Sequence, residues 1–262
     1  MMMYLLSDEG RKALRKVATR SVLYAFDFDG TLTKLSPQRD QVKLSPITHE
    51  WLRELARRVP CTVVSGRALH DLTPRLTGIV PYLIGNHGIE SPLISDESLS
   101  PMEHICREWM TQLNGDLGAS LKDKPVELEA KRYSLTLHYR AAGDSDIVER
   151  VLKPLVQQLA PLPRVIMGKT TVNILPPGSG GKGGAALALM RHLRCEGLFY
   201  IGDDTTDEDV FALTDGLAMG VRVGSHPESQ ARYYVKSQSE VEDVLRFLVH
   251  RLDRTPETAD VK

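Results

Sequence analysis

The segment from Val22 to Thr31, with the sequence VLYAFDFDGT, constrains the fold more strongly than any other part of the chain. Its first five residues are apolar, which predicts a strand buried on both faces, and Asp27 and Asp29 follow directly. Buried strands of this kind belong to parallel sheets, whose C-terminal ends face the crevice where ligands bind. Two carboxylates placed there repel each other unless a cation or a proton lies between them. The segment therefore predicts a ligand site, and the alternative is a polar strand end with a turn.

Three further apolar runs repeat this arrangement of a buried strand with a polar end. They are Cys61–Val64 before Ser65-Gly66-Arg67, Tyr82–Ile84 before residues 85–90, and Leu198–Ile201 before residues 202–209. Helical spacing of apolar residues predicts helices at 48–59, with Thr48 as its N-cap, at 183–195 and at 241–252. Short strands are also expected at 217–221 and 233–235. Because strands that alternate with helices pair in parallel, we predict an α/β domain built on a parallel sheet.

The pattern changes between residues 92 and 176, where a helix followed by two strands occurs twice. The helices are expected at 101–121 and 147–159, and the strands at 126–129, 133–139, 164–167 and 171–175. Strands joined by such short connections are antiparallel. We therefore predict a core domain at 1–91 and 177–262 and an inserted α+β domain at 92–176. In the strand that starts at Tyr133, the polar face carries His138 and Arg140, and it either meets the core or is solvated.

Composition excludes several classes of function. Among 262 residues, 33 Lys and Arg balance 34 Asp and Glu, so no long-range field attracts nucleic acid or an anionic membrane. The three cysteines are unclustered, which favours a reducing compartment. The apolar N-terminal run reaches Asp8 too soon for a signal peptide, and no apolar stretch approaches membrane-spanning length. We expect a cytoplasmic monomer without nucleic-acid or membrane partners.

Polar residues that are far apart in the sequence are predicted to meet at one edge of the parallel sheet. These are Asp27 and Asp29, Ser65 with Gly66, Lys182, and an acidic cluster that begins at Asp203. Five acids between residues 203 and 209 favour a hard cation, and oxygen ligands select Mg²⁺. A metal, a lysine, a hydroxyl and main-chain donors around one carboxylate form a phosphoryl-transfer site.

The two acids of the first strand end suggest how the reaction proceeds. One carboxylate can act as the nucleophile and form an aspartyl phosphate. Asp29 can protonate the leaving alkoxide and then activate water, which favours a phosphatase or a mutase. Taken alone, Lys182 reads as a solvated helix start, and the residues from Thr206 to Glu208 read as a helix cap.

These motifs resemble those of the haloacid dehalogenase superfamily. DFDGT at 27–31, Ser65-Gly66-Arg67, Lys182 and the segment from Gly202 to Asp207 follow its four motifs in order. GDDTTDE at 202–208, NHGIE at 86–90 and LTLHYR at 135–140 are similar to segments of trehalose-6-phosphate phosphatases.

This resemblance implies a Rossmann-like core, an αββαββ cap that closes over a sugar phosphate, and a Mg²⁺ cofactor. It makes Asp27 the nucleophile and Asp29 the acid/base, with Ser65 and Lys182 as further catalytic residues. Asp203 would bind the metal, Asp207 would be a ligand through water or an orienting neighbour, and Asp27 and Asp29 would complete the metal set. The substrate-binding residues that we expect are Thr31, Gly66, Arg67, His87, Glu90, His138, Arg140, Lys169 and Asn173.

One position departs from the family pattern. Family caps carry Gly-Lys, three further residues and a Glu, whereas Gly168-Lys169 is followed by Asn173. Asn keeps hydrogen-bonding capacity but loses charge and reach. The expected substrate is trehalose 6-phosphate, and the alternatives are sucrose 6-phosphate, a glycosyl-glycerate phosphate, a mutase reaction or a non-catalytic sugar-phosphate sensor.

Overall fold

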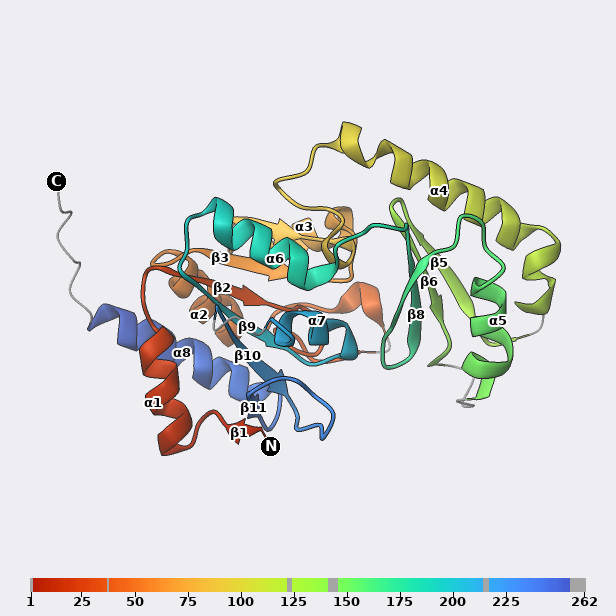
Figure 1. Ribbon diagram of the computed structural model, residues 1–262. Coiled ribbons are helices and arrows are strands. Elements are labelled where there is room, and N and C mark those ends of the chain that lie inside the picture. Colours follow the sequence, from red (N-terminus) through yellow and green to blue (C-terminus); the bar gives the residue numbers. More distant parts are fainter. Residues whose placement is uncertain (1, 37, 122–123, 141–145, 214–216, 255–262) are drawn as a thin grey trace.

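The computed structural model describes residues 2–36, 38–121, 124–140, 146–213 and 217–254. A seven-stranded parallel sheet forms the core domain, in the order β1-β11-β10-β9-β2-β3-β4 (Figure 1). This confirms the predicted α/β class. The strands are β1 (Met3–Tyr4), β2 (Val22–Phe26), β3 (Cys61–Val64), β4 (Tyr82–Ile84), β9 (Gly197–Gly202), β10 (Ala218–Val223) and β11 (Tyr233–Val235). All five residues of β2 are buried, as its apolar sequence requires.

Helices cover both faces of this sheet (Figure 1). One face packs against α1 (Asp8–Val17), α2 (Pro46–Ala56), α3 (Leu69–Leu76) and α8 (Ser239–Asp253), and the other against α6 (Gly181–His192) and α7 (Glu208–Phe211). The prediction that Thr48 caps its helix is wrong. The N-cap residue of α2 is Ser45, whose Oγ accepts a hydrogen bond from the Thr48 N–H at 3.0 Å. Pro46 suits the first helical position because it has no N–H to satisfy.

A separate four-stranded antiparallel sheet, in the order β5-β6-β8-β7, confirms the predicted cap architecture. Its helices are α4 (Asp96–Asn114), a 3-10 turn (Asp116–Leu121), and a π-helical turn (Val148–Leu152) that continues into α5 (Lys153–Val156). Its strands are β5 (Glu127–Lys131), β6 (Ser134–His138), β7 (Arg164–Met167) and β8 (Thr171–Leu175). Trp109, Leu135 and Leu137 lie in its own apolar core. The cap therefore buries apolar surface independently of the core domain.

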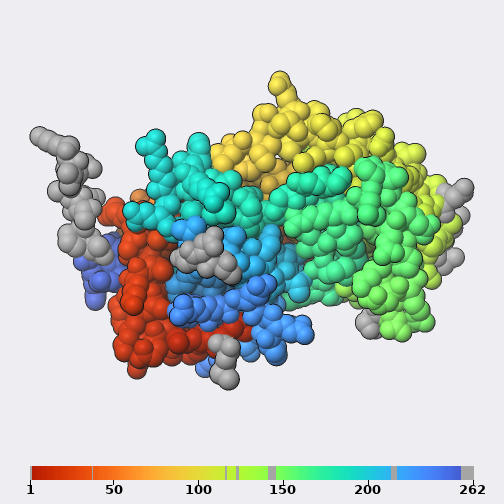
Figure 2. Space-filling model, viewed as in Figure 1, coloured from red at the N-terminus to blue at the C-terminus, as the bar shows by residue number. Residues whose placement is uncertain are grey.

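The first cap helix differs from its predicted range of 101–121. It begins at Asp96, where Ser95 caps the N-terminus, and it ends at Asn114, before Gly115. Figure 2 shows the cap, in yellow and green, packed against the core domain.

Gly88 (φ +102°) lies just before the first crossing of the chain between the two domains and Gly181 (φ +77°) opens α6 just after the second, and both glycines adopt backbone conformations that other residues rarely tolerate. A Cβ atom on Gly88 would collide with the carbonyl oxygen of Gly181. The close approach of the two segments therefore depends on glycine.

Candidate active site

The ends of the parallel strands bring the predicted polar residues together. Asp27 follows β2, Asp203 follows β9, and Lys182 lies in the first turn of α6. The Lys182 Nζ lies 2.7 Å from an oxygen of Asp27 and 2.7 Å from an oxygen of Asp207. Carboxylate oxygens of Asp27, Asp203 and Asp207 lie within 4.8 Å of one another, and all three residues are buried.

The buried lysine balances this negative charge. Burial by itself lowers the pKa of Lys182, but Asp207 and Asp27 outweigh it and raise the pKa above its ordinary value, so the side chain is an ammonium. Burial raises the pKa of Asp203 to about 6, against the lowering effect of Lys169. A further cation beside this cluster would therefore lower its electrostatic free energy.

Asp207 is used entirely in holding its neighbours. One of its oxygens accepts hydrogen bonds from Lys182 and, at 2.6 Å, from the Tyr200 hydroxyl. The other accepts from the main-chain N–H groups of Asp203 and Asp204, both at 2.9 Å. This arrangement favours the orienting role among the two roles expected for Asp207.

The remaining carboxylate oxygens fit a hard cation. The Oδ1 of Asp203 is buried and has no hydrogen-bond partner among the described residues. Gly30, at φ +88°, allows this carboxylate to approach the turn after β2, because a Cβ there would collide with Asp203. The Lys169 ammonium contacts the other Asp203 oxygen from the cap. An all-oxygen set beside an unpartnered buried carboxylate oxygen suits Mg²⁺.

Arg67 holds Asp29. Its Nε and Nη2 donate to the two carboxylate oxygens at 2.6 and 2.7 Å, and its Nη1 donates to Asp71 at 2.6 Å. Arg67 is only 5% exposed. Burial lowers the pKa of the guanidinium, but the two carboxylates more than reverse this effect, so the charge persists. The motif predicts a substrate contact for Arg67, and nothing in the sequence indicates this pairing with Asp29.

A cleft of about 250 Å³ lies between these residues and the cap. The predicted residues that line it are Asp27, Asp29, Ser65, Gly66, Arg67, His87, His138, Arg140, Lys169, Asn173, Lys182 and Asp203. Thr31 and Glu90 do not line it. Thr31 is fully buried, and Glu90 accepts hydrogen bonds from the Leu69 N–H and from Asn86. A larger groove between α1 and α8 contains none of the strand-end residues.

His87 presents a neutral imidazole to the cleft. Burial, followed by the nearby positive charge of Lys131, lowers the pKa of His87 well below its ordinary value. Both ring nitrogens are buried and lack a hydrogen-bond partner within the part of the chain that the structure describes. The ring packs on Gly66, where a Cβ would lie 2.6 Å from the His87 Cε1. These nitrogens can therefore serve a ligand in the cleft.

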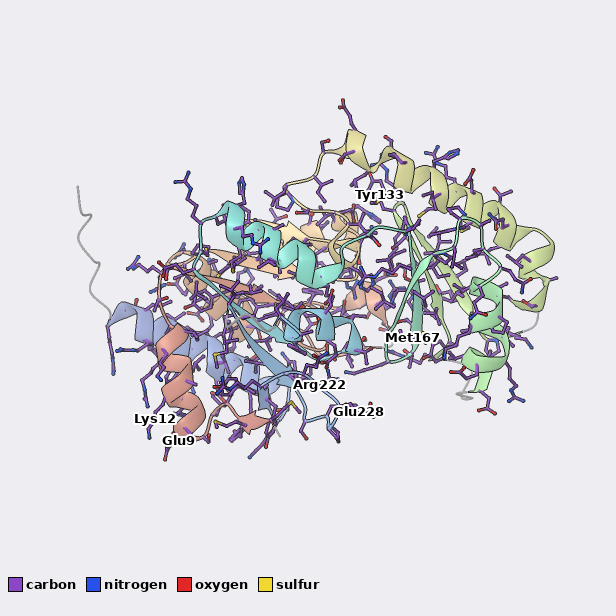
Figure 3. All side chains as sticks on the ribbon, in the orientation of Figure 1. Glu9, Lys12, Tyr133, Met167, Arg222 and Glu228 are labelled. Carbon is purple, nitrogen blue, oxygen red and sulfur yellow. The ribbon has the colours of Figure 1, made fainter. Side chains whose placement is uncertain are left out.

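Sequence reasoning missed two cations that line the cleft. Arg39 lies in a polar loop between β2 and α2, and Lys131 ends β5. Neither residue belongs to a motif or to a periodic pattern, so no signal in a single sequence distinguishes them from surface charges. Two further hydrogen bonds lie beside the cleft. The Thr205 hydroxyl donates to the main-chain carbonyl of Met167, and Arg222 donates to the main-chain carbonyl of Asp204 (Figure 3 labels Met167 and Arg222).

Comparison with known proteins identifies the family. The trehalose-phosphatase family model matches residues 25–241. The chain is 31% identical over 198 residues to a trehalose-phosphate phosphatase of Mycobacterium tuberculosis, covering 71% of this chain and 49% of that protein. It is 25% identical over 266 residues to a probable trehalose-phosphate phosphatase of rice, covering 88% of this chain and 70% of that protein. The chain thus spans about half the length of the mycobacterial relatives that it matches.

Among solved structures, the C-terminal domain of the Candida albicans trehalose-6-phosphate phosphatase has the same fold. Its TM-score is 0.75 at 19% sequence identity, and the match covers 95% of this chain and 98% of that one. Among the described residues, no helix combines the length and the apolar character needed to span a membrane. The family match confirms the resemblance inferred from the motifs, and the chain belongs to the trehalose-phosphatase family.

Proposed function

We propose that this protein is a Mg²⁺-dependent phosphatase that hydrolyses trehalose 6-phosphate to trehalose and inorganic phosphate. The observation that carries the proposal is the contact of Lys182 with Asp27 beside Asp203, under a cap that carries polar side chains. This arrangement supplies a buried nucleophile, a fixed positive charge and an oxygen site for a cation.

In the proposed reaction, a carboxylate oxygen of Asp27 attacks phosphorus and the bond to the sugar oxygen breaks. Asp29 donates a proton to that oxygen, and trehalose leaves. Asp29 then takes a proton from water as the water attacks the aspartyl phosphate, which releases phosphate and restores Asp27. Because Arg67 contacts both oxygens of Asp29, protonation of either oxygen loosens only one of the two contacts.

Several groups would bind the phosphoryl oxygens during both steps. Lys182 supplies a positive charge, and Ser65 and the Gly66 N–H supply neutral donors. Asp27, Asp203 and the main-chain carbonyl of Asp29 would hold Mg²⁺, which neutralises charge as a Lewis acid when bound. Asp207 contributes by orienting Lys182.

For the sugar, we propose contacts from polar side chains that line the cleft: His87, His138, Arg140, Lys169 and Asn173. The cleft can offer these donors and acceptors in a convergent set, which sugar recognition requires. Thr31 and Glu90 lie outside the cleft, and the burial of Thr31 and the hydrogen bonds that Glu90 accepts favour structural roles instead.

Another glycosyl phosphate is the second candidate substrate, and Asn173 favours it. Its carbonyl oxygen accepts from Thr136 at 3.0 Å and its amide donates to the Ile166 carbonyl at 3.1 Å. Asn173 is neutral, and these two bonds use only part of the hydrogen-bonding capacity of its amide, where related caps offer a charged Glu.

The test is release of phosphate from trehalose 6-phosphate, sucrose 6-phosphate and glucose 6-phosphate, with Mg²⁺ or with EDTA. We expect activity on trehalose 6-phosphate that EDTA removes, Asp27→Asn abolishes and Asp29→Asn strongly reduces. Asp243→Asn, which changes a surface carboxylate paired with Arg246, is the matched control and should retain activity. Full activity of Asp27→Asn would refute the covalent route, and preference for a monosaccharide phosphate would refute the substrate assignment.

We also propose a cytoplasmic monomer. Cys61, Cys106 and Cys195 are free thiols, and burial raises the pKa of each, which suits a reducing compartment. Light scattering coupled to gel filtration measures the mass directly, and a value near 58 kDa, about twice the 29.2 kDa of the chain, would refute the monomer.

A further inference from the structure

A loop of the core domain contacts the cap through Arg39. The Arg39 Nη2 lies 2.6 Å from a carboxylate oxygen of Glu129 in β5, and its Nη1 lies 2.9 Å from the Nε2 of His138 in β6. That same Nε2 lies 2.8 Å from the other oxygen of Glu129. Because one ring nitrogen cannot both donate to Glu129 and accept from Arg39, the firm contact of Arg39 is the ion pair with Glu129.

The main chain of Arg39 contacts the core domain, whereas its side chain contacts the cap. Its carbonyl oxygen accepts a hydrogen bond from the Arg67 Nη2 at 3.0 Å, and the same nitrogen donates to Asp29 at 2.7 Å. Contacts therefore run without a break from Glu129 through Arg39 and Arg67 to Asp29. They join a cap strand to the residue that we propose as the acid/base.

A second contact runs beside the first. The Lys131 ammonium, at the end of β5, donates to the Gly66 carbonyl at 3.1 Å, and Gly66 precedes Arg67. Lys131 is buried and lies 3.5 Å from Glu129. Two residues of β5, Glu129 in its middle and Lys131 at its end, thus hold the segments that position Arg67, so a shift of the cap would disturb the hydrogen bonds around Asp29.

We propose that Arg39 is a positioning residue that couples closure of the cap to the orientation of Asp29. The inference rests on the proposed function. Ion pairing with Glu129 holds the Arg39 loop in place when the cap is closed, and the Arg39 carbonyl then completes the set of acceptors around Arg67. When the cap opens, the loop loses its partner and Arg67 loses one of the groups that fix it. General acid catalysis is thereby favoured only over a closed cleft, where water is excluded.

The first experiment needs no substrate. Amide hydrogen exchange is followed by mass spectrometry for residues 39–41 and 127–131 in the free protein and in Arg39→Met. We expect exchange to rise at least about threefold in both segments, because the contact that joins them is lost. Arg58→Met is the matched control, since Arg58 also forms ion pairs in the core domain, with Glu54 and Asp253, but far from the cap. Unchanged exchange in Arg39→Met would overturn the proposal.

The second experiment separates coupling from a general loss of structure. With Mg²⁺, we expect Arg39→Met to lower kcat for trehalose 6-phosphate about tenfold, equivalent to about 1.4 kcal/mol, and to raise KM less than kcat falls. The loss with p-nitrophenyl phosphate, which is too small to bridge cap and core, should be clearly smaller. Arg39→Lys keeps the charge and should recover part of kcat.

The two experiments can contradict two different claims. Equal losses with both substrates, together with no recovery in Arg39→Lys, would overturn the coupling. A wild-type protein that is inactive on trehalose 6-phosphate would refute the proposed function, while the exchange experiment would still decide whether Arg39 joins the cap to the core.

Discussion

Replacement of Lys182 by methionine tests the charge balance under the strand ends. The Lys182 ammonium lies 2.7 Å from both Asp27 and Asp207, and the side chain is only 3% exposed. Methionine is unbranched and nearly as long, so it fills the space without the charge. Removal of one partner from a buried ion pair costs about 3–5 kcal/mol, because the remaining charge is left without compensation. We expect the free energy of unfolding at pH 7.5 to fall by that amount.

The sign of the pH dependence follows from the carboxylates. Burial, followed by the neighbouring carboxylates, raises the pKa of Asp27 well above its ordinary value, against the lowering effect of Lys182. Loss of Lys182 raises it further. A group whose folded pKa is raised favours the folded state below its unfolded pKa, about 3.9, and this contribution is lost as pH rises. The deficit of Lys182→Met should therefore shrink between pH 7.5 and pH 5.

Urea unfolding followed by far-UV circular dichroism measures both quantities, with EDTA present so that no divalent cation replaces the lysine. Lys12→Met is the control, since Lys12 is 60% exposed and pairs with Glu9 on the surface of α1 (Figure 3). It should change the free energy by no more than about 0.5 kcal/mol. A deficit below about 1 kcal/mol for Lys182→Met, or one that does not change with pH, would refute this account of the site.

Three further changes test other parts of the cleft. Gly66→Ala places a Cβ 2.6 Å from the His87 ring, so phosphate release should fall about tenfold to a hundredfold. The far-UV circular dichroism spectrum should stay unchanged, and wild-type activity of the variant would contradict this packing. Asn173→Glu sets a carboxylate against the Ile166 carbonyl, which should lower stability in urea by about 1–3 kcal/mol; unaltered selectivity between trehalose and sucrose 6-phosphates would show that this position does not choose the sugar. Burial raises the pKa of Glu129, but its cationic neighbours outweigh this and hold it well below the ordinary value, so Glu129→Gln should lower the Tm at pH 7 and by a smaller amount at pH 3, where protonation of the unfolded chain removes part of the stabilisation; an equal loss at both would contradict the ion pair.

The sequence predicted the elements that have a strong local pattern. The five apolar residues of β2 and the alternation of strands with helices were sufficient for the class of the sheet. Strand β1, with only Met3 and Tyr4, was not predicted, because two residues carry no periodicity and their pairing with β11 is non-local. The prediction of Thr48 as the N-cap residue of α2 is wrong because Ser45, Pro46 and Thr48 all suit a helix start. The geometry of the turn selects Ser45.

In the candidate site, too, residues with a local pattern could be predicted, and contacts between distant segments could not. Asp27, Ser65, Lys182 and Asp203 could be placed together because parallel topology brings strand ends to one edge. The contact between Arg39 and Glu129 could not be foreseen, since 90 residues separate the two, and the strand pattern that contains Glu129 does not say which residue its side chain meets. Ion pairs across a domain interface depend on how two separately folded bodies dock, and that information is not local in the sequence.

The contact between Gly88 and Gly181 limits how the cap can move. Two connections that were far apart would fix one axis of rotation, as two hinges do, whereas two segments that touch act as a single pivot that holds the cap beside the core domain while it rotates. Points on the cap sweep distances that grow with their separation from this pivot, so the tip of the β7–β8 hairpin near Lys169 travels farther than Ser134, which donates to Asn86 beside the first crossing. Entry of a bulky sugar and departure of phosphate would then share one opening, on the side of the cleft away from the glycines.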